Sequence, residues 1–513
     1  FTDAVRGYYD VIRAQAARIY NHHEKQRFLH AIYENFYKVY NPKAADRLGI
    51  VYTPGEIVRF MLQATDTLLE RHFGKTLGDP GVEILDPATG TGTFLTELID
   101  YLPKHQLKHK YTHELHANEL SILPYYIAHL NIEATYQQKM GRYRQFEHLV
   151  LVDTLDNMGF GRVGKQQEMF KSISAENLAR IQEQNRRKIS VIIGNPPYNV
   201  GQINYSDDNP NRKYPAIDKR IKETYVQQGT AQNQNQLYDM YVRFFRWASD
   251  RLGEEGVLAF VTNRSYLESL TFDGVRKVLG QEFAELWLVD LGGDVRMNPK
   301  LSGTTHNVFG IQTGVAIGFF IKRKQEHHSP RILYVRRPEM EIAKDKLAYL
   351  RENSLLSLDQ NGAFQQLYPD KRHNWLHVQD NDWDELLAVC DKNVKAGYDE
   401  RAVFEVFSTG VQSGRDEWVI DLCEESLNKK IEFFISQFNS DKPKYSIKYE
   451  STILRYKKRN IMLSIDRSKF AYKIYRPFFK VKFYFSRQLN KRMFAWDKIL
   501  PSGDSNNVII PKP

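Results

Sequence analysis

The chain has 513 residues, enough for two to four domains at roughly 150 residues each, which excludes a miniprotein. Lys and Arg total 72 and Asp and Glu total 62, so the net charge is +10. Two cysteines, with no CxxC or Cys/His cluster, exclude a disulfide framework and structural zinc, and we expect no metal. Two cysteines suit a reducing compartment, so we expect a cytoplasmic protein. No apolar run approaches the roughly 18 residues of a membrane span, so we expect no membrane contact.

The first 40 residues are predicted to be helical, because apolar side chains recur there at helical spacing. These positions are Phe28, Ile32, Phe36 and Val39. The same spacing between Ile57 and Leu68 predicts a second helix. The chain begins with Phe1 rather than Met, and we expect it to be a piece of a longer polypeptide.

Beyond residue 80, short apolar runs typical of buried parallel strands alternate with helical stretches such as Phe94–Leu102 and Leu237–Leu252. The runs are Val82–Leu85, Leu149–Val152, Val191–Ile193, Val257–Val261 and Leu286–Leu291. This alternation predicts an α/β fold with a doubly wound, mostly parallel Rossmann-like sheet. Two polar inserts interrupt it: 156–188, predicted to be partly helical, and 199–235, predicted to be a long loop.

From about Lys324 the alternation ends and strand-forming residues become frequent. We therefore expect a helical leader or coupler segment over 1–48, the α/β domain over 49–323, and a mixed α+β domain over 324–513.

Basic residues concentrate near the carboxyl end of the chain. Between Lys429 and Lys498, 19 Lys and Arg stand against 5 Asp and Glu, a local charge of +14, so the remainder is slightly acidic. Sixteen aromatic residues interleave with these cations. The combination favours contact with nucleic acid, for which we single out Lys457, Lys458 and Arg459. A solvated face with snorkelling lysines is the alternative.

A glycine-rich turn follows the first predicted strand, which ends at Asp86. The turn is Pro87-Ala88-Thr89-Gly90-Thr91-Gly92. Glycines here let the backbone approach a ligand closely and leave the N–H groups of the next helix facing it. Taken alone, such a turn is equally compatible with a phosphate loop or an ordinary strand-to-helix turn.

Acidic residues end the next two predicted strands. Glu119 lies about 27 residues beyond the glycines, where it can accept both ribose hydroxyls, and Asp153 lies where an adenine amine would need an acceptor. A second glycine pattern, Gly159 to Lys165, is rejected as a phosphate loop because Gln166 replaces the required Ser or Thr. These features predict an adenosine ligand without phosphates, and S-adenosylmethionine fits.

The sequence Asn195-Pro196-Pro197-Tyr198 directly follows the strand ending at Gly194. The exocyclic amine of adenine is a poor nucleophile because its lone pair is delocalised into the ring. The Asn195 side-chain oxygen and the Pro196 carbonyl can accept its hydrogens and draw the nitrogen toward tetrahedral geometry, and the consecutive prolines rigidify that carbonyl. Tyr198 offers a face for stacking a flipped base. A structural proline turn is the alternative.

As a set, these motifs resemble gamma-group DNA methyltransferases that make N6-methyladenine. The order is similar: Tyr52-Thr53-Pro54, then the cofactor turn, the catalytic tetrapeptide and target recognition. In that family the Tyr-Thr-Pro segment closes over the methionine end of the cofactor. The expected cofactor residues are Thr53, Pro54, Asp86, Pro87, Ala88, Thr89, Gly90, Gly92, Phe94, Glu119, Asp153 and Thr154.

Two further segments, 303–311 and 410–415, resemble type ISP restriction-modification enzymes, single polypeptides that also carry a nuclease and a helicase-like translocase. The resemblance implies that 49–323 is the methyltransferase domain and that 324–513 is a target-recognition domain, complete or not, for double-stranded DNA. Arg212 and Lys213 of the 199–235 loop are further expected DNA contacts. The chain shows no Walker A motif and no nuclease site, so these neighbours are expected elsewhere in the parent polypeptide.

Other functions remain open at this point. The tetrapeptide also occurs in enzymes that methylate a protein glutamine amide or an RNA guanine amine, and cytosine N4 methylation uses similar chemistry. Cytosine C5 methylation is excluded because neither cysteine follows a proline. A catalytically silent DNA sensor of a phage-defence complex would show a damaged tetrapeptide or cofactor turn, and both are intact here.

Overall fold

The computed structural model describes residues 53–157, 175–197, 214–231, 234–295, 298, 303–324, 329–376, 386–398 and most of 401–494. The chain divides after Val378 into two compact units. The helix predicted in residues 1–40 and three predicted site residues, Tyr198, Arg212 and Lys213, lie outside the described residues.

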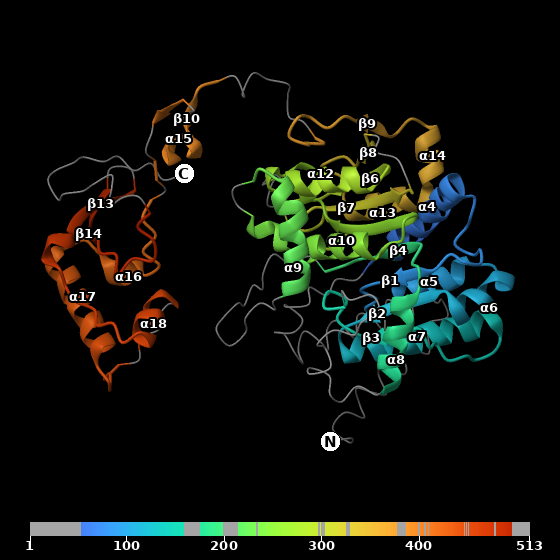
Figure 1. Cartoon of the computed structure of the whole chain (residues 1–513), viewed down its shortest axis with the longest axis horizontal. Coiled ribbons are helices and arrows are strands. Elements are labelled where there is room, and N and C mark those ends of the chain that lie inside the picture. Colours follow the sequence, from blue (N-terminus) through green and yellow to red (C-terminus); the bar gives the residue numbers. More distant parts are fainter. Residues whose placement is uncertain are drawn as a thin grey trace. The chain divides into compact units, whose positions relative to one another are not determined.

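The first unit is built around a nine-stranded sheet with the order β3-β2-β1-β4-β5-β7-β6-β8-β9 (Figure 1). Its strands are β1 (Ile84–Asp86), β2 (Leu115–Glu119), β3 (Leu149–Leu151), β4 (Val191–Gly194), β5 (Gly256–Asn263), β6 (Glu285–Gly292), β7 (Val315–Lys322), β8 (Arg331–Arg336) and β9 (Gln365–Leu367). All predicted apolar runs form strands, and only β7 and β9 run antiparallel to their neighbours. The mostly parallel doubly wound sheet is therefore confirmed, with β7 inserted between β5 and β6.

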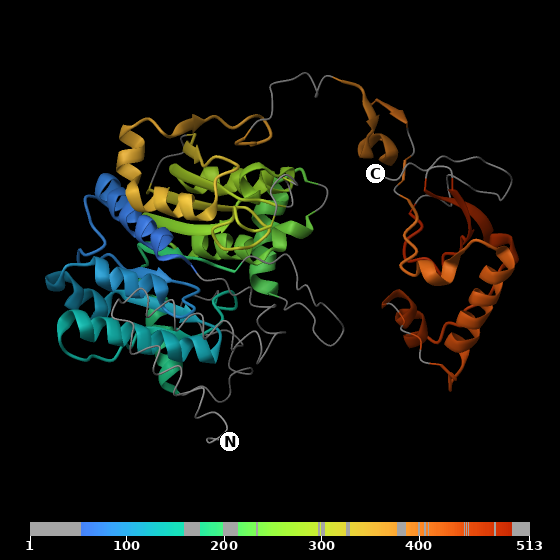
Figure 2. The same ribbon diagram turned by 180° about the vertical axis from the view of Figure 1, so that it is seen from behind.

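Helices cover both faces of this sheet, and each face has its own hydrophobic core. One face carries α4 (Gly55–Phe73), α5 (Thr93–Tyr101), α6 (Lys104–His113), α7 (Ile122–Met140), α13 (Ala343–Glu352) and α14 (Leu355–Gln360). The other carries α9 (Pro215–Ile221), the π-helix η2 (Lys222–Val226), η3 (Asn235–Tyr238), α10 (Met240–Arg251), α11 (Ser265–Glu268), η4 (Leu270–Phe272) and α12 (Asp273–Glu282). Helix α8 (Ala175–Arg186) packs beside β3. Figure 2 shows α4 in blue and α13 in gold packed together.

The strands alternate between the two cores because successive side chains of a strand point to opposite faces. In β5, Val257 and Ala259 enter the core under α4, whereas Leu258 and Phe260 enter the core under α10. The carboxyl ends of β1 to β6 share one edge of the sheet. Ligands of open parallel sheets bind outside this edge.

Two features differ from the sequence prediction. Residues 215–226 are helical rather than loop, because Ile217, Ile221 and Tyr225 bury a common side against the sheet. The sheet also continues beyond residue 324 through β8 and β9, so the first compact unit extends to Val378 rather than ending at 323. The buried run Ile332–Val335 adds these strands to the edge of the sheet.

The second unit is a mixed α+β structure, as predicted for the carboxyl-terminal domain. Its strands are β10 (Ala388–Cys390), paired with β11 (Ala402–Phe404), and β12 (Ile420–Asp421), β14 (Phe479–Tyr484) and β13 (Phe470–Arg476) in a second sheet. Its helices are α15 (Lys392–Ala396), α16 (Asp416–Val419), α17 (Glu424–Asn439), α18 (Ser451–Lys458) and the 3₁₀ turn η6 (Arg467–Lys469). Leu427, Ile431 and Phe434 of α17 pack against Phe483 of β14 to form its core.

Among the described helices, none combines the length and apolar character that crossing a bilayer requires.

Candidate active site

The turn after β1 is folded by glycines and by bonds to the next strand. Gly90 and Gly92 have φ angles of 58° and 90°, in the left-handed region where a Cβ atom is unfavourable. The Thr89 N–H donates to the carbonyl of Asn118 at 2.9 Å. The Ala88 N–H donates to Asp86 Oδ1 at 3.1 Å. The turn is therefore fixed between the carboxyl ends of β1 and β2.

Glu119 at the end of β2 ties this turn to the start of α7. Its Oε2 accepts the Gly90 N–H at 2.9 Å, and its Oε1 accepts the Ser121 N–H at 2.7 Å. Burial raises the pKa of Glu119 to about 7. Each carboxylate oxygen has a second lone pair, so Glu119 can still accept hydrogen bonds from a ligand.

In β1 and β2, two buried acceptors have no hydrogen-bond partner among the described residues: Asp86 Oδ2 and Asn118 Oδ1. Both side chains are fully buried, and burial raises the pKa of Asp86 to about 8. Burying such acceptors without donors costs free energy, so a ligand that supplies ammonium and hydroxyl donors fits this site. S-adenosylmethionine carries those donors.

Gly194 at the end of β4 leaves space for the Asp86 carboxylate. A Cβ atom at this position would lie 2.9 Å from Asp86 Oδ1 and 3.4 Å from Pro87 Cδ. The last residue of β4 must therefore be small for Asp86 to keep its position.

The residues that follow β3 have different roles. The Thr154 hydroxyl donates to the Pro87 carbonyl at 2.6 Å and accepts from Asn118 Nδ2 at 3.1 Å, so it supports the cofactor turn. Asp153 accepts the Leu155 N–H at 3.1 Å and the Tyr214 hydroxyl at 3.3 Å.

Phe94 lies in the first turn of α5, directly after the glycine-rich turn, and its side chain packs into the core with 4% exposure.

Asn195 lies at the carboxyl end of β4, next to the cofactor turn. Its Nδ2 donates to Thr53 Oγ1 at 2.9 Å, although the two residues are 142 positions apart. Its Oδ1 is buried and has no hydrogen-bond partner among the described residues. The structure thus brings Thr53 of the Tyr-Thr-Pro segment together with the first residue of the tetrapeptide, and leaves the amide oxygen as an acceptor.

Helix α4 begins directly after this contact. The Pro54 carbonyl accepts the N–H groups of Ile57 and Val58, at 3.0 and 3.2 Å. One turn later, Arg59 forms an ion pair of 2.9 Å with the buried Glu97 of α5. The segment that carries Thr53 is therefore fastened to the helix that follows the cofactor turn.

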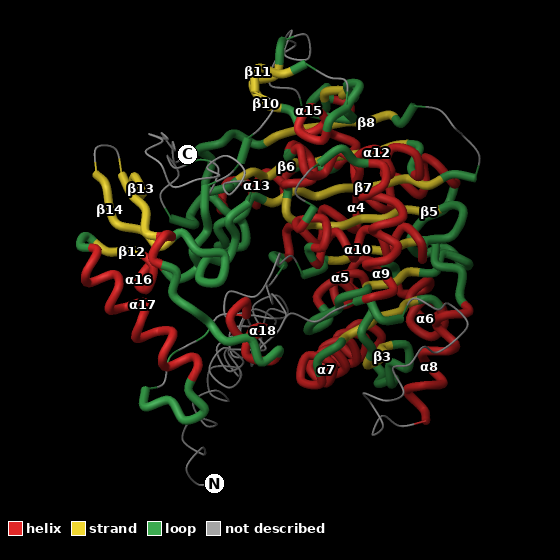
Figure 3. Tube along the Cα trace, turned by 60° about the vertical axis from the view of Figure 1, so that its left-hand side comes forward, coloured by secondary structure: helices red, strands yellow, loops and turns green. Residues whose placement is uncertain are grey.

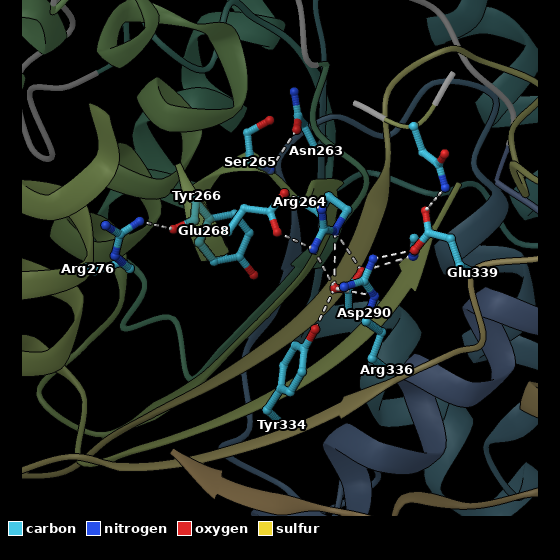
Figure 4. A network of polar contacts seen from close by, with 12 residues as sticks. Asn263, Arg264, Ser265, Tyr266, Glu268, Arg276, Asp290, Tyr334, Arg336 and Glu339 are labelled. Atoms are coloured by element: carbon cyan, nitrogen blue, oxygen red, sulfur yellow. Dashed lines mark hydrogen bonds and ion pairs between the residues drawn. The ribbon is translucent and has the colours of Figure 1, made fainter. Parts of the chain in front are cut away.

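A buried ion-pair network braces the same edge at β5 and β6 (Figure 4). Arg264 donates to both oxygens of Asp290 at 2.9 to 3.1 Å, and it also binds Glu268. Asp290, which is fully buried, accepts the Tyr334 hydroxyl at 2.7 Å as well. Arg264 reaches Asp290 past Gly314, where a Cβ atom would lie 2.4 Å from Arg264 Cδ.

The cations singled out in the second unit lie at the end of α18. Lys457, Lys458 and Arg459 are exposed and form no ion pair with any described residue. Lys429 and Lys430 instead pair with Glu425 and Asp421, at 2.7 and 2.6 Å.

Two family models match the sequence. The N-6 DNA Methylase model matches residues 24–279, and the Type ISP C-terminal specificity domain model matches residues 402–512. The chain belongs to the N-6 DNA methylase family. The resemblance in the sequence motifs is thereby confirmed. Asp86, Glu119 and Asn195 lie at the same carboxyl edge of the sheet, at the ends of β1, β2 and β4.

Several solved structures are similar to this chain over nearly its whole length. The DrdV–DNA complex is 47% identical with a TM-score of 0.86, and covers 98% of this chain and 50% of its own. The ATP-dependent Type ISP restriction-modification enzyme LlaBIII bound to DNA is 30% identical with a TM-score of 0.85, and covers 98% and 34%. A nuclease-deletion mutant of the Type ISP enzyme LlaGI with a DNA substrate mimic is 29% identical with a TM-score of 0.81, and covers 98% and 42%.

This chain thus spans half or less of the length of these relatives. A comparison with curated proteins found no significant match.

Four features of the site were missed by the sequence reasoning. Asn118 precedes Glu119 in the same strand, and its polarity in a buried strand was a usable signal. Gly194 immediately precedes the tetrapeptide and was also recognisable. Tyr214 and the pair of Arg59 with Glu97 depend on contacts between segments far apart in sequence, which no local pattern shows.

Proposed function

We propose that this chain transfers the methyl group of S-adenosylmethionine to the N6 atom of an adenine in double-stranded DNA. It would be the modification part of a longer cytoplasmic restriction-modification polypeptide with a nuclease and a translocase. The DNA-bound type ISP enzymes that resemble nearly the whole chain support this assignment.

The observation that carries the proposal is the unpartnered Asn195 Oδ1 at the carboxyl end of β4. The bond from Asn195 Nδ2 to Thr53 fixes the amide so that its oxygen is the group presented to a ligand. That oxygen accepts one hydrogen of the target amine, and the Pro196 carbonyl accepts the other. With both hydrogens held, the nitrogen lone pair is less delocalised into the ring and becomes nucleophilic.

The cofactor residues act by binding and orientation. S-adenosylmethionine, when bound, supplies an electrophilic methyl group. Asp86 accepts from its ammonium, Glu119 from the ribose hydroxyls and Asp153 from the adenine amine, while the turn 87–92 allows close approach of the backbone. Thr53 and Pro54 close over the methionine end of the cofactor. Thr154 and Phe94 support the turn 87–92 from the side of the protein core.

We place DNA contact in two regions. Tyr198 stacks the flipped base, and Arg212 and Lys213 bind phosphates in the segment that follows it. Lys457, Lys458 and Arg459 bind phosphates within the target-recognition domain, for which we retain the functional range 324–513, with 49–323 as the methyltransferase domain and 1–48 as the leader.

The test is transfer of labelled methyl groups from S-adenosylmethionine to plasmid DNA by the wild type and by Asn195→Ala. The variant should lose at least about a hundredfold in rate, because one acceptor of the target amine is removed at the reacting atom. Its affinity for S-adenosylmethionine, measured by titration calorimetry, should fall far less than the rate, because the variant loses the bond to Thr53 but keeps Asp86, Glu119 and Asp153. Asn353→Ala, at the end of α13, is the matched control and should retain full activity.

Substantial residual transfer by Asn195→Ala would contradict the assignment of Asn195. A wild-type protein that binds the cofactor but transfers nothing would instead favour the silent DNA sensor. Methyl label on RNA, when RNA is offered in place of the plasmid, would indicate an RNA amino-methyltransferase. Label at N4 of cytosine would indicate a cytosine-N4 methyltransferase.

A further inference from the structure

Asp153, to which we assign the adenine amine of the cofactor, lies in the segment that follows β3. Its side chain is buried, and the residue is 3% exposed. Its Oδ1 accepts the N–H of Leu155, two residues further along the same segment, at 3.1 Å. Its Oδ2 accepts the hydroxyl of Tyr214 at 3.3 Å, although the two residues are 61 positions apart. One donor to this carboxylate therefore comes from a distant part of the chain.

Tyr214 is held in place by contacts other than this hydrogen bond. It directly precedes α9, and its carbonyl accepts the Asp218 N–H at 2.9 Å. The residue is 4% exposed and belongs to the core between the sheet and α10. The guanidinium of Arg243 in α10 lies 5.3 Å from the centre of its ring and forms an ion pair of 2.7 Å with Asp218. Helices α9 and α10, which pack against each other, thus fix the ring (Figure 3).

A second contact joins the segment after β3 to α10. The indole N–H of Trp247 donates to the Asn157 carbonyl at 3.3 Å. The Asn157 N–H donates in turn to the Asp153 carbonyl at 3.1 Å. This contact holds the backbone of the segment, whereas Tyr214 reaches the carboxylate itself. Removal of the Tyr214 hydroxyl should therefore release the carboxylate and leave the backbone in place.

The orientation of the Asp153 carboxylate determines how well it accepts a ligand donor. Each carboxylate oxygen has a second lone pair, so Oδ2 can accept the Tyr214 hydroxyl and a ligand amine together. A hydrogen bond weakens steeply when its angle is poor. A side chain that is oriented before binding also loses less conformational freedom when the ligand arrives. The Tyr214 hydroxyl supplies this orientation.

We propose that Tyr214 is a positioning residue of the cofactor site, whose hydroxyl holds the Asp153 carboxylate in the orientation that accepts the 6-amino group of adenine. Tyr214 acts through Asp153 rather than on the reacting atoms. The inference rests on the proposed function, because it takes Asp153 as the adenine acceptor. It deepens that function by assigning part of the adenine recognition to the start of α9.

The test compares two ligands of the full chain by titration calorimetry: S-adenosylmethionine, and an analogue whose purine lacks the 6-amino group. Tyr214→Phe keeps the ring and removes the hydroxyl. It should weaken binding of S-adenosylmethionine roughly three- to tenfold and binding of the analogue by less than about twofold. Tyr225→Phe is the matched control and should leave both affinities unchanged. Tyr225 is fully buried in the same core, and its hydroxyl has no hydrogen-bond partner among the described residues.

A double-mutant cycle with Asp153→Ala shows whether the hydroxyl acts through the carboxylate. When Asp153 is already alanine, adding Tyr214→Phe should change the affinity for S-adenosylmethionine by less than about twofold. Additive effects in this cycle, or equal weakening of both ligands by Tyr214→Phe, would overturn the proposal, because the hydroxyl would then support the fold in general. An affinity of Tyr214→Phe for S-adenosylmethionine equal to that of the wild type would overturn it as well.

Failure of the proposed function would give a different result. A wild-type protein whose variants show the expected pattern of affinities, but which transfers no methyl groups to plasmid DNA, would contradict the methyltransferase function and support the role of Tyr214.

Discussion

Two buried carboxyl groups determine how the cofactor site should respond to pH. Burial raises the pKa of Asp86 to about 8 and that of Glu119 to about 7, and the Glu119 charge adds to the shift at Asp86. Since these values are raised in the folded state, the ligand-free protein holds more protons than the unfolded chain between about pH 5 and 8. Its free energy of unfolding should therefore fall as the pH rises through that range.

Affinity for S-adenosylmethionine should change in the opposite sense. The ligand's ammonium and hydroxyl groups favour the charged carboxylates, so binding should release protons and strengthen from pH 6 to 8, by at most about tenfold per pH unit for each group. Titration calorimetry in buffers of different ionisation enthalpy measures both quantities. Asp86→Asn should bind weakly and with a flatter pH profile. An affinity of the wild type that is independent of pH would contradict these residue roles.

The sequence was sufficient to single out residues of a local motif as candidates, such as Asp86 in its turn and Asn195 in its tetrapeptide, and the structure places both at the carboxyl edge of the sheet. The hydrogen bond between Thr53 and Asn195 was not predicted, because the two residues are 142 positions apart and the resemblance placed Thr53 only at the cofactor. That Asn118 Oδ1 has no hydrogen-bond partner among the described residues could not be predicted, because it depends on which donors the fold brings near it.

At the scale of elements, the end of β4 and the turn after β1 must fit closely. Gly194→Ala would place a methyl group 2.9 Å from Asp86 Oδ1, so we expect a loss of roughly 1–3 kcal/mol in stability and weaker cofactor binding. Thermal unfolding and calorimetry measure the two effects. Gly253→Ala is the control, because its nearest neighbour would lie at an ordinary 3.4 Å. Equal behaviour of the two variants would mean that Asp86 has room to move.

The braced edge at β5 and β6 gives a second prediction. Asp290→Asn removes the fully buried one of the two carboxylate partners of Arg264 and leaves Glu268, so it should lower the free energy of unfolding in urea by up to about 3–5 kcal/mol. Glu339→Gln removes the half-exposed partner of Arg336 and should cost less than about 1 kcal/mol. A small effect of Asp290→Asn would show that the network contributes little to the fold.

Helices and strands were predictable where the spacing of apolar residues was clear. The order of the strands within the sheet was not predictable. β7 was recognisable only as an apolar run. Its place between β5 and β6 depends on antiparallel pairing with both strands, which no local sequence pattern shows. Helix α9 was missed because the polar insert around it masked the spacing of Ile217, Ile221 and Tyr225. The strand signal of Ile332–Val335 was overlooked because it lies beyond the change in rhythm near Lys324.

At the scale of the whole molecule, charge is unevenly divided. The +14 of residues 429–498 exceeds the +10 of the entire chain, so the remainder carries −4. Some of these cations are already paired, as Lys429 and Lys430 are, whereas the three at the end of α18 are exposed.

The affinity for DNA should therefore fall steeply with salt, and the end of α18 should account for part of the slope. Replacing Lys457, Lys458 and Arg459 together with Gln should flatten the log–log slope by up to about three units. Lys429→Gln/Lys430→Gln should flatten it less, because both lysines have carboxylate partners. Fluorescence anisotropy over a salt series gives both slopes. An unchanged slope in the triple variant would make this cluster a solvated face.

The most direct test of the central claim is single-molecule sequencing of plasmid DNA from cells that express this chain or its Asn195→Ala variant. The proposed mechanism predicts N6-methyladenine at one recurring sequence with the wild type and none with the variant. Modified cytosine, or an unmodified plasmid from cells whose folded protein binds S-adenosylmethionine, would contradict it.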